Sequence, residues 1–138
     1  MNEAAARIET LSAVTLTVSE IARSVRFYES LSFRQRPGHS APGFASFELA
    51  GAGHGYLNLL EGPLGAAEGW GRVIFHVSDV DAFYRQVEAA GAVPEFAPRD
   101  APWGERYFHL RDPDGHELSF AKPLAQACRL HGSSMKYA

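Results

Sequence analysis

The stretch that decides the fold is AVTLTVSEIARSVRFYESLSFR, residues 13–34, because the chain repeats its pattern as RVIFHVSDVDAFYRQVEAAGAV, residues 72–93. Each copy runs from an alternating apolar segment into a Ser and an acidic residue, and then into apolar positions at helical spacing. This pattern predicts a strand and an amphipathic helix in each copy, with Ser19 and Ser78 as helix N-caps. A repeat near half the chain length predicts one domain of two like modules, each too small to bury its own apolar face.

Length, charge and composition exclude several classes of protein. The chain has 138 residues, close to the commonest domain size, and its net charge of −3 offers no basic surface for nucleic acid. No stretch approaches the roughly 18 apolar residues of a membrane span, and residues 1–10 lack the apolar run of a signal peptide. Cys128 is the only cysteine, which excludes an intrachain disulfide and makes a cytoplasmic setting the default expectation.

The pattern along the chain predicts the element order βαβββ twice, which is an α+β fold whose two modules form an open, cleft-bearing, barrel-like sheet. The first module is predicted to hold a helix over 20–31 and strands over 12–18, 33–37, 44–49 and 55–60. The second is predicted to hold a helix over 79–90, ended by Gly91, and strands over 72–77, 93–96, 106–110 and 117–121. We expect a single domain over 8–124, with module one at 8–62, a linker at 63–71, module two at 72–124 and a tail at 125–138.

Two motifs carry a resemblance to a known family. The segment VTLTVSE (14–20) followed by SVRFY (24–28) resembles the opening of the glyoxalase/bleomycin-resistance/dioxygenase superfamily, the vicinal oxygen chelate fold. The segment PWG (102–104) followed by LRDPDG (110–115) resembles its closing signature. The resemblance covers roughly residues 11–123 and implies a two-module fold with a ligand cleft. It leaves the chemistry open, since the superfamily includes lyases, isomerases, dioxygenases, thiol transferases and drug-binding proteins.

The resemblance also implies where a metal would bind, because members with metal chemistry place four His, Gln or Glu ligands in the cleft. The matching positions here are Ala13, Asn58, Arg72 and Ser119. Alanine has no donor atom, arginine repels a cation, and serine and asparagine are weak neutral ligands. We therefore expect neither a metal nor another cofactor. A displaced ligand set built on His76 and His109 is the less favoured alternative, because a lone histidine on a sheet is more often structural.

Strand alternation assigns side chains to the cleft face. The predicted ligand-binding residues are Thr15, Thr17, Tyr56, Asn58, Arg72, His76, Trp103, Tyr107, His109 and Ser119, with Leu60 and Phe44 beside them. Such a lining suits a planar or amphipathic organic molecule. Trp103 either stacks on that ligand or plugs the end of the barrel. Arg72 either pairs with a ligand anion or nearby acid, or extends to water.

The remaining histidines, the cysteine and the carboxylates give little indication of a catalytic or binding role. His54 and His116 lie in predicted turns and are expected to be solvated, while His39 and His131 indicate nothing specific. Cys128 lies in the unpatterned tail without the electropositive setting of a reactive thiol. No pair of carboxylates is placed where both would face the cleft.

The favoured function is metal-independent binding, or sequestration, of a small aromatic or drug-like metabolite, as in the bleomycin-resistance proteins and their role in antibiotic resistance. One alternative is a metal-dependent enzyme of the glyoxalase or dioxygenase type with unusual ligands. Another is a metal-free lyase or isomerase in which His76 or His109 acts as general acid or base. We also expect a homodimer, because the apolar faces of 14–18 and 73–77 need a second sheet to cover them.

Overall fold

A computed structural model describes residues 6–49, 55–65 and 70–124 of the chain. The first module contains β1 (Ala13–Val18), α1 (Ile21–Ser30), β2 (Arg34–Gln35), β3 (Phe44–Glu48) and β4 (Tyr56–Glu61). The second contains β5 (Val73–His76), α2 (Val80–Ala89), β6 (Arg99–Asp100), β7 (Glu105–Arg111) and β8 (Glu117–Pro123). The βαβββ order is confirmed in both modules.

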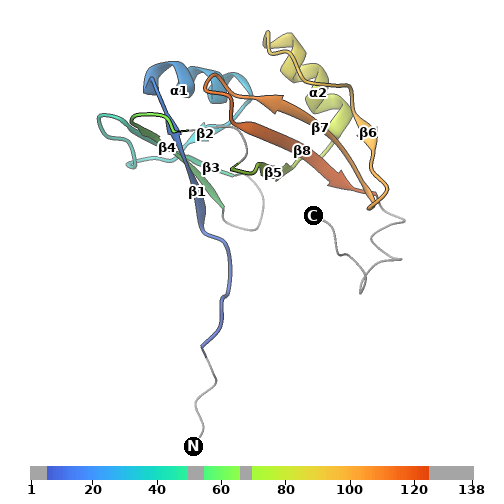
Figure 1. The fold of residues 1–138 in the computed structure, drawn as a ribbon, viewed down its shortest axis with the longest axis horizontal. Coiled ribbons are helices and arrows are strands. Elements are labelled where there is room, and N and C mark those ends of the chain that lie inside the picture. Colours follow the sequence, from blue (N-terminus) through green and yellow to red (C-terminus); the bar gives the residue numbers. More distant parts are fainter. Residues whose placement is uncertain (1–5, 50–54, 66–69, 125–138) are drawn as a thin grey trace, which may run out of the picture.

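Each module forms its own four-stranded mixed sheet, and the two sheets share one topology. The strand orders are β1-β4-β3-β2 and β5-β8-β7-β6. In both, the first strand runs parallel to the last strand of the same module, and the other pairs are antiparallel. The α+β prediction is confirmed, and the two sheets do not close into a barrel (Figure 1).

Both helices cover the same side of the two sheets (Figure 1). The strand positions that face the helices form the core, with Leu16, Val18, Phe47, Leu59, Phe75, Phe108, Leu118 and Phe120 among its buried members. The apolar faces of β1 and β5 are thus covered by the chain's own helices, and the prediction that they need a second sheet was wrong. No described helix or strand covers the opposite side of the sheets, which we call the open face.

The helix starts differ from the prediction by one residue. Asp79, not Ser78, is the N-cap of α2, and its carboxylate accepts the backbone N–H of Ala82 at 3.0 Å. Glu20 holds the N-cap position of α1 without a capping side chain. Ser19 instead donates to a carboxylate of the other module.

The predicted strand at 93–96 is absent. This part of the chain contains Pro94 and Pro98, which lack the N–H that a sheet ladder needs. One backbone hydrogen bond links this segment to β7: the N–H of Glu95 donates to the carbonyl of His109 at 2.9 Å. The edge strand of module two is β6 instead. Gly91, at φ +92°, follows α2 as predicted.

The modules meet through the turn between β7 and β8. Asp114, whose side chain is 2% exposed, accepts a hydrogen bond from the Ser19 hydroxyl at 2.6 Å and pairs with Arg23 at 3.0 Å. The rings of Phe33 and Phe75 pack edge to face at 5.2 Å and join the two halves of the core. Contacts between modules therefore come from turns and side chains rather than from a shared sheet ladder.

Candidate functional site

The open face of module one carries a ladder of short polar side chains. The Ser46 hydroxyl donates to Asn58 Oδ1 at 2.6 Å, and Asn58 Nδ2 donates to Thr15 Oγ1 at 3.3 Å. The register pairs Thr15 with Asn58 and Thr17 with Leu60, so strand alternation placed these residues on one face correctly. Both the oxygen and the nitrogen of the Asn58 side-chain amide are thus hydrogen-bonded to neighbouring strands, and these bonds fix the orientation of the amide across the sheet.

The open face of module two carries a cluster of aromatic rings, which we call the aromatic shelf: Phe96, Trp103, Tyr107 and His109. Ring centroids lie 5.5 Å apart for Phe96 and Tyr107, 5.9 Å for Trp103 and Tyr107, and 5.1 Å for Phe96 and His109. Trp103 and His109 are half-buried. The Trp103 indole donates to Glu105 Oε1 at 3.1 Å, which fixes the orientation of its ring.

Arg99 lies against this shelf. Its guanidinium carbon is 3.8 Å from the centroid of the Phe96 ring and 5.5 Å from that of Tyr107. The register pairs Arg99 of β6 with Tyr107 of β7, so both side chains lie on the open face. Sequence reasoning missed both Arg99 and Phe96, because the irregular segment before β6 has no periodicity that assigns its side chains to a face.

An ion-pair network adjoins the shelf. Arg72 Nε donates to Glu117 Oε1, Arg111 Nη2 lies 3.3 Å from Glu117 Oε2, and Arg111 Nε lies 3.4 Å from Glu95 Oε2. His109 Nδ1 lies 3.9 Å from Glu117 Oε2. Arg72 therefore pairs with a nearby acid. The prediction that no two carboxylates face the cleft was wrong, because Glu95 and Glu117 meet here.

Two pKa shifts follow from this packing. Burial is the largest single influence and raises the pKa of Glu117, but the hydrogen bond from Arg72 and the positive charges of Arg72 and Arg111 together outweigh it, so the net pKa lies below the usual value. Burial lowers the pKa of His109. His109 is thus a neutral imidazole near pH 7, able to accept a proton or a hydrogen bond.

The four positions that the superfamily uses for a metal do not fit one here. Ala13 has no donor, Asn58 is hydrogen-bonded on both sides, and Arg72 is a cation paired with Glu117. Ser119 is only 2% exposed. Ligand atoms of Glu95, His109 and Glu117 do lie within 4.8 Å of one another. Both carboxylates of that group already pair with arginines, so the network is an ion-pair cluster rather than a set of free ligands.

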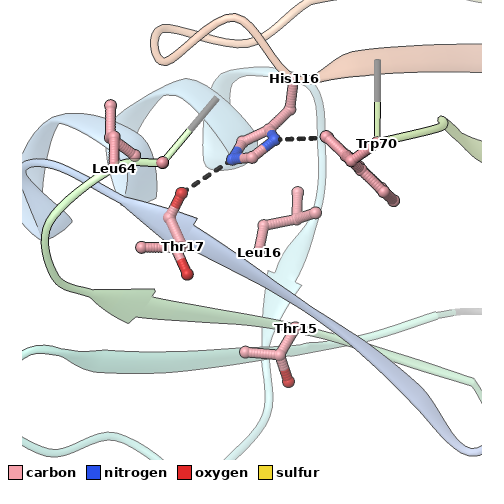
Figure 2. Close-up of a pocket in the computed structure, with 7 residues that line it drawn as sticks. Thr15, Leu16, Thr17, Leu64, Trp70 and His116 are labelled. Carbon is pink, nitrogen blue, oxygen red and sulfur yellow. Dashed lines mark hydrogen bonds between the residues drawn. The ribbon is translucent and has the colours of Figure 1, made fainter. Parts of the chain in front are cut away.

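A cavity of about 220 Å³ lies between β1, the end of β4 and the turn before β8 (Figure 2). It is lined by Thr15, Leu16, Thr17, Leu64, Gly65, Trp70 and His116. The Trp70 indole donates to His116 Nδ1 at 3.1 Å, and His116 Nε2 lies 2.7 Å from the carbonyl of Thr17. Because an indole N–H can only donate, His116 is neutral here and its Nε2–H donates to Thr17. His116 is 6% exposed, so the prediction that it is solvated was wrong.

The other predicted residues divide between the two parts of the face. Tyr56 lies on module one under the guanidinium of Arg36, whose carbon is 3.8 Å from the ring centroid. His76 is exposed on β5, where its register partner is Ala121. His39 is exposed, and its ring Nδ1 lies 2.8 Å from the carbonyl oxygen of Pro37. Three further residues named in the predictions lie outside the described residues: His54, Cys128 and His131.

Among the residues that the structure describes, no helix is long and apolar enough to span a bilayer.

Comparison with known proteins places this geometry in a family. The model of the Glyoxalase/Bleomycin resistance protein/Dioxygenase superfamily matches residues 10–120. A glyoxalase/bleomycin resistance protein/dioxygenase from Nocardioides is 26% identical, with a TM-score of 0.68 over 88% of this chain and 87% of that one. A bleomycin resistance determinant encoded on the transposon Tn5 has a similar fold, with a TM-score of 0.69 over 83% of this chain and 98% of its own, at 22% identity.

Among curated proteins, the uncharacterised protein Mb0911c of Mycobacterium bovis is 40% identical over 50 residues. That stretch is 36% of this chain and spans 33% of the relative's length. The family match, by contrast, covers most of the chain and both modules, which agrees with the duplicated fold. The chain therefore belongs to the Glyoxalase/Bleomycin resistance protein/Dioxygenase superfamily.

Proposed function

We propose that the protein binds a small aromatic or drug-like metabolite on its open face, without a metal. The observation that carries this proposal is the aromatic shelf, in which the buried ring of Tyr107 and the half-buried rings of its neighbours pack together on a face that no described element covers. Offset and edge-to-face ring contacts stabilise an aromatic partner by about 0.5–1.5 kcal/mol each beyond burial. The similarity to the Nocardioides protein supports the proposal, because that protein is described as a glyoxalase/bleomycin resistance protein/dioxygenase.

The test is a titration with a panel of aromatic antibiotics and metabolites, followed by calorimetry. Trp103→Ala should weaken binding of a genuine ligand at least about tenfold, which corresponds to roughly 1.4 kcal/mol. Trp70→Phe is the matched control, because Trp70 is the chain's other tryptophan and lines the cavity beside His116 instead of the shelf. Equal affinity of the wild type and the folded Trp103→Ala variant would place the ligand elsewhere.

A second candidate is a metal-free lyase or isomerase, favoured by the state of His109. Its side chain is 13% exposed, stands between two shelf rings and has a lowered pKa, so it is available as a base near neutral pH. Chemical analysis of the ligand after incubation separates the two functions. Conversion that is lost in His109→Gln, with binding retained, would establish the enzyme.

We also propose that the protein acts as a homodimer. Four large apolar side chains are exposed on the part of the chain that runs from the end of β4 to β5, where one module passes to the other, and we call them the junction patch: Leu60, Leu64, Trp70 and Ile74. Exposed apolar side chains gathered in one region commonly mark a contact with another protein, and a second copy is the commonest partner.

A further inference from the structure

The aromatic shelf holds a positive charge that no carboxylate of the described residues neutralises by direct pairing. Arg99 is exposed, stacks on Phe96 at 3.8 Å, and donates from Nε to the Tyr107 hydroxyl at 3.2 Å. Within the described residues no carboxylate lies within 4.0 Å of its guanidinium. The other arginines near the site or in the module contact do pair with acids: Arg23, Arg72, Arg106 and Arg111.

Stacking on rings can by itself be a structural role, worth about 0.5–1 kcal/mol at an exposed site. It uses the flat face of the guanidinium, however. Of the in-plane N–H groups, that of Nε already donates to Tyr107, while those of Nη1 and Nη2 make no hydrogen bond to another described residue and are left to donate at the edge. Arg36 repeats the arrangement on Tyr56 in module one, again with no described carboxylate within 4.0 Å. An arginine held by rings and left without an acid is suited to receive an anion from solution.

The neighbouring charges support this reading. In the adjoining network Arg72 and Arg111 are balanced by Glu117 and Glu95. His109 adds no charge, because burial keeps it neutral near pH 7. Among the described residues, the acid that hydrogen-bonds to a ring of the shelf is Glu105, and its carboxylate accepts the hydrogen bond of the Trp103 indole. The charge left to attract a ligand is therefore that of Arg99.

We propose that the ligand of the shelf is a planar aromatic anion, an aryl carboxylate or phenolate, whose charged oxygens accept hydrogen bonds from the edge of Arg99 while its ring packs against Trp103. This inference rests on the proposed binding function and names the chemical class that the site selects. It makes Arg99, rather than the acid-paired Arg72, the residue that determines specificity. That selectivity comes from charge-assisted hydrogen bonds between the guanidinium of Arg99 and the anionic oxygens of the ligand.

The experiment uses two matched probes, 2-naphthoate and its neutral counterpart 2-naphthamide, titrated calorimetrically into the full chain. Wild-type protein should bind the naphthoate at least about tenfold more tightly, as expected for a hydrogen bond to a charged group. Arg99→Gln should abolish the preference and leave the affinity for the amide nearly unchanged. Arg99→Lys should keep part of it, because lysine retains the charge but not the planar fork. Arg85→Gln, on an exposed position of α2 across the sheet, is the control and should keep the full preference.

The outcomes separate the inference from the proposed function. If the wild type binds both probes equally well, or if Arg99→Gln weakens both equally, the anion inference is overturned while aromatic binding stands. If neither probe binds the folded wild type, the aromatic shelf is not a ligand site and both proposals fail. A preference that survives in Arg99→Gln but is lost in Arg72→Gln would move the anion site to the ion-pair network and also overturn the inference.

Discussion

The hydroxyl of Tyr28 donates to Asp112 Oδ2 at 2.8 Å, and this hydrogen bond joins the helix of one module to the last turn of the other. The Tyr28 and Asp112 residues are 0% and 5% exposed. Asp112 Oδ1 also accepts the backbone N–H groups of Asp114 and His116, each at 2.9 Å. One buried carboxylate therefore shapes its own turn and fixes that turn to the other half of the molecule.

Removing the Tyr28 hydroxyl should weaken the whole domain. Tyr28→Phe keeps the ring packing but leaves Asp112 Oδ2 buried without its donor, which should lower the free energy of unfolding by about 1.5–3 kcal/mol. Urea denaturation measures the change. Tyr84→Phe is the matched control, because Tyr84 is only partly buried and lies outside the module contact, so its loss should be about 0.5 kcal/mol or less. Equal effects of both substitutions would contradict a special role for the buried bond.

The same pair predicts how stability depends on alkaline pH. Burial, and then the negative charge of Asp112, hold the pKa of Tyr28 well above its ordinary value of 10.0. The folded chain thus keeps this proton where the unfolded chain releases it, so the free energy of unfolding should fall as pH rises above about 10. The contribution is fully present below that pH. Urea titrations at about pH 8 and about pH 10.5 measure it, and the fall should be smaller in Tyr28→Phe. An identical fall in both proteins would refute the assignment.

The fold was predictable because the same sequence pattern occurs twice in the chain, and because apolar residues recur at different spacings in strands and in helices. Alternation over 14–18 placed Thr15 and Thr17 on the open face, and this placement holds in the structure. The prediction of a strand failed at 93–96, where Pro94 lacks the N–H that a sheet ladder needs. Local pattern could not show this, since pairing with β7 decides the outcome.

The site was less predictable, because the residues that the sequence analysis missed or misplaced reach it through contacts with residues distant in sequence. His116 lies in a turn, where solvent exposure is the ordinary expectation. It is buried because that turn docks on β1, and its ring reaches a carbonyl 99 residues away. Arg99 enters the shelf through pairing of β6 with β7, which no periodicity signals in a two-residue strand.

The ion-pair network makes a prediction about metals. Because Arg72 and Arg111 pair with Glu117 and Glu95, purified protein should hold far less than one Zn, Ni or Fe per chain by elemental analysis. If the guanidinium groups are what exclude a cation, the double variant Arg72→Gln/Arg111→Gln should bind zinc at least about tenfold more tightly than the wild type. Arg106→Gln, which removes a guanidinium from a different pair, is the control. One tightly held metal per wild-type chain would contradict the prediction and favour the enzyme alternative.

The junction patch predicts a homodimer that a single charge can disrupt. Ile74 is 39% exposed on the open face of β5, and the other apolar members of the patch precede it along the chain. If a second copy covers it, sedimentation at micromolar concentration should give a species of twice the chain mass of 15.1 kDa. Ile74→Lys would bury an unpaired ammonium in that contact and should yield the monomer. Val93→Lys is the control, because Val93 is 85% exposed and outside the patch, so the variant should remain dimeric. A wild-type monomer, or an Ile74→Lys protein that still dimerises, would show that the patch has another role.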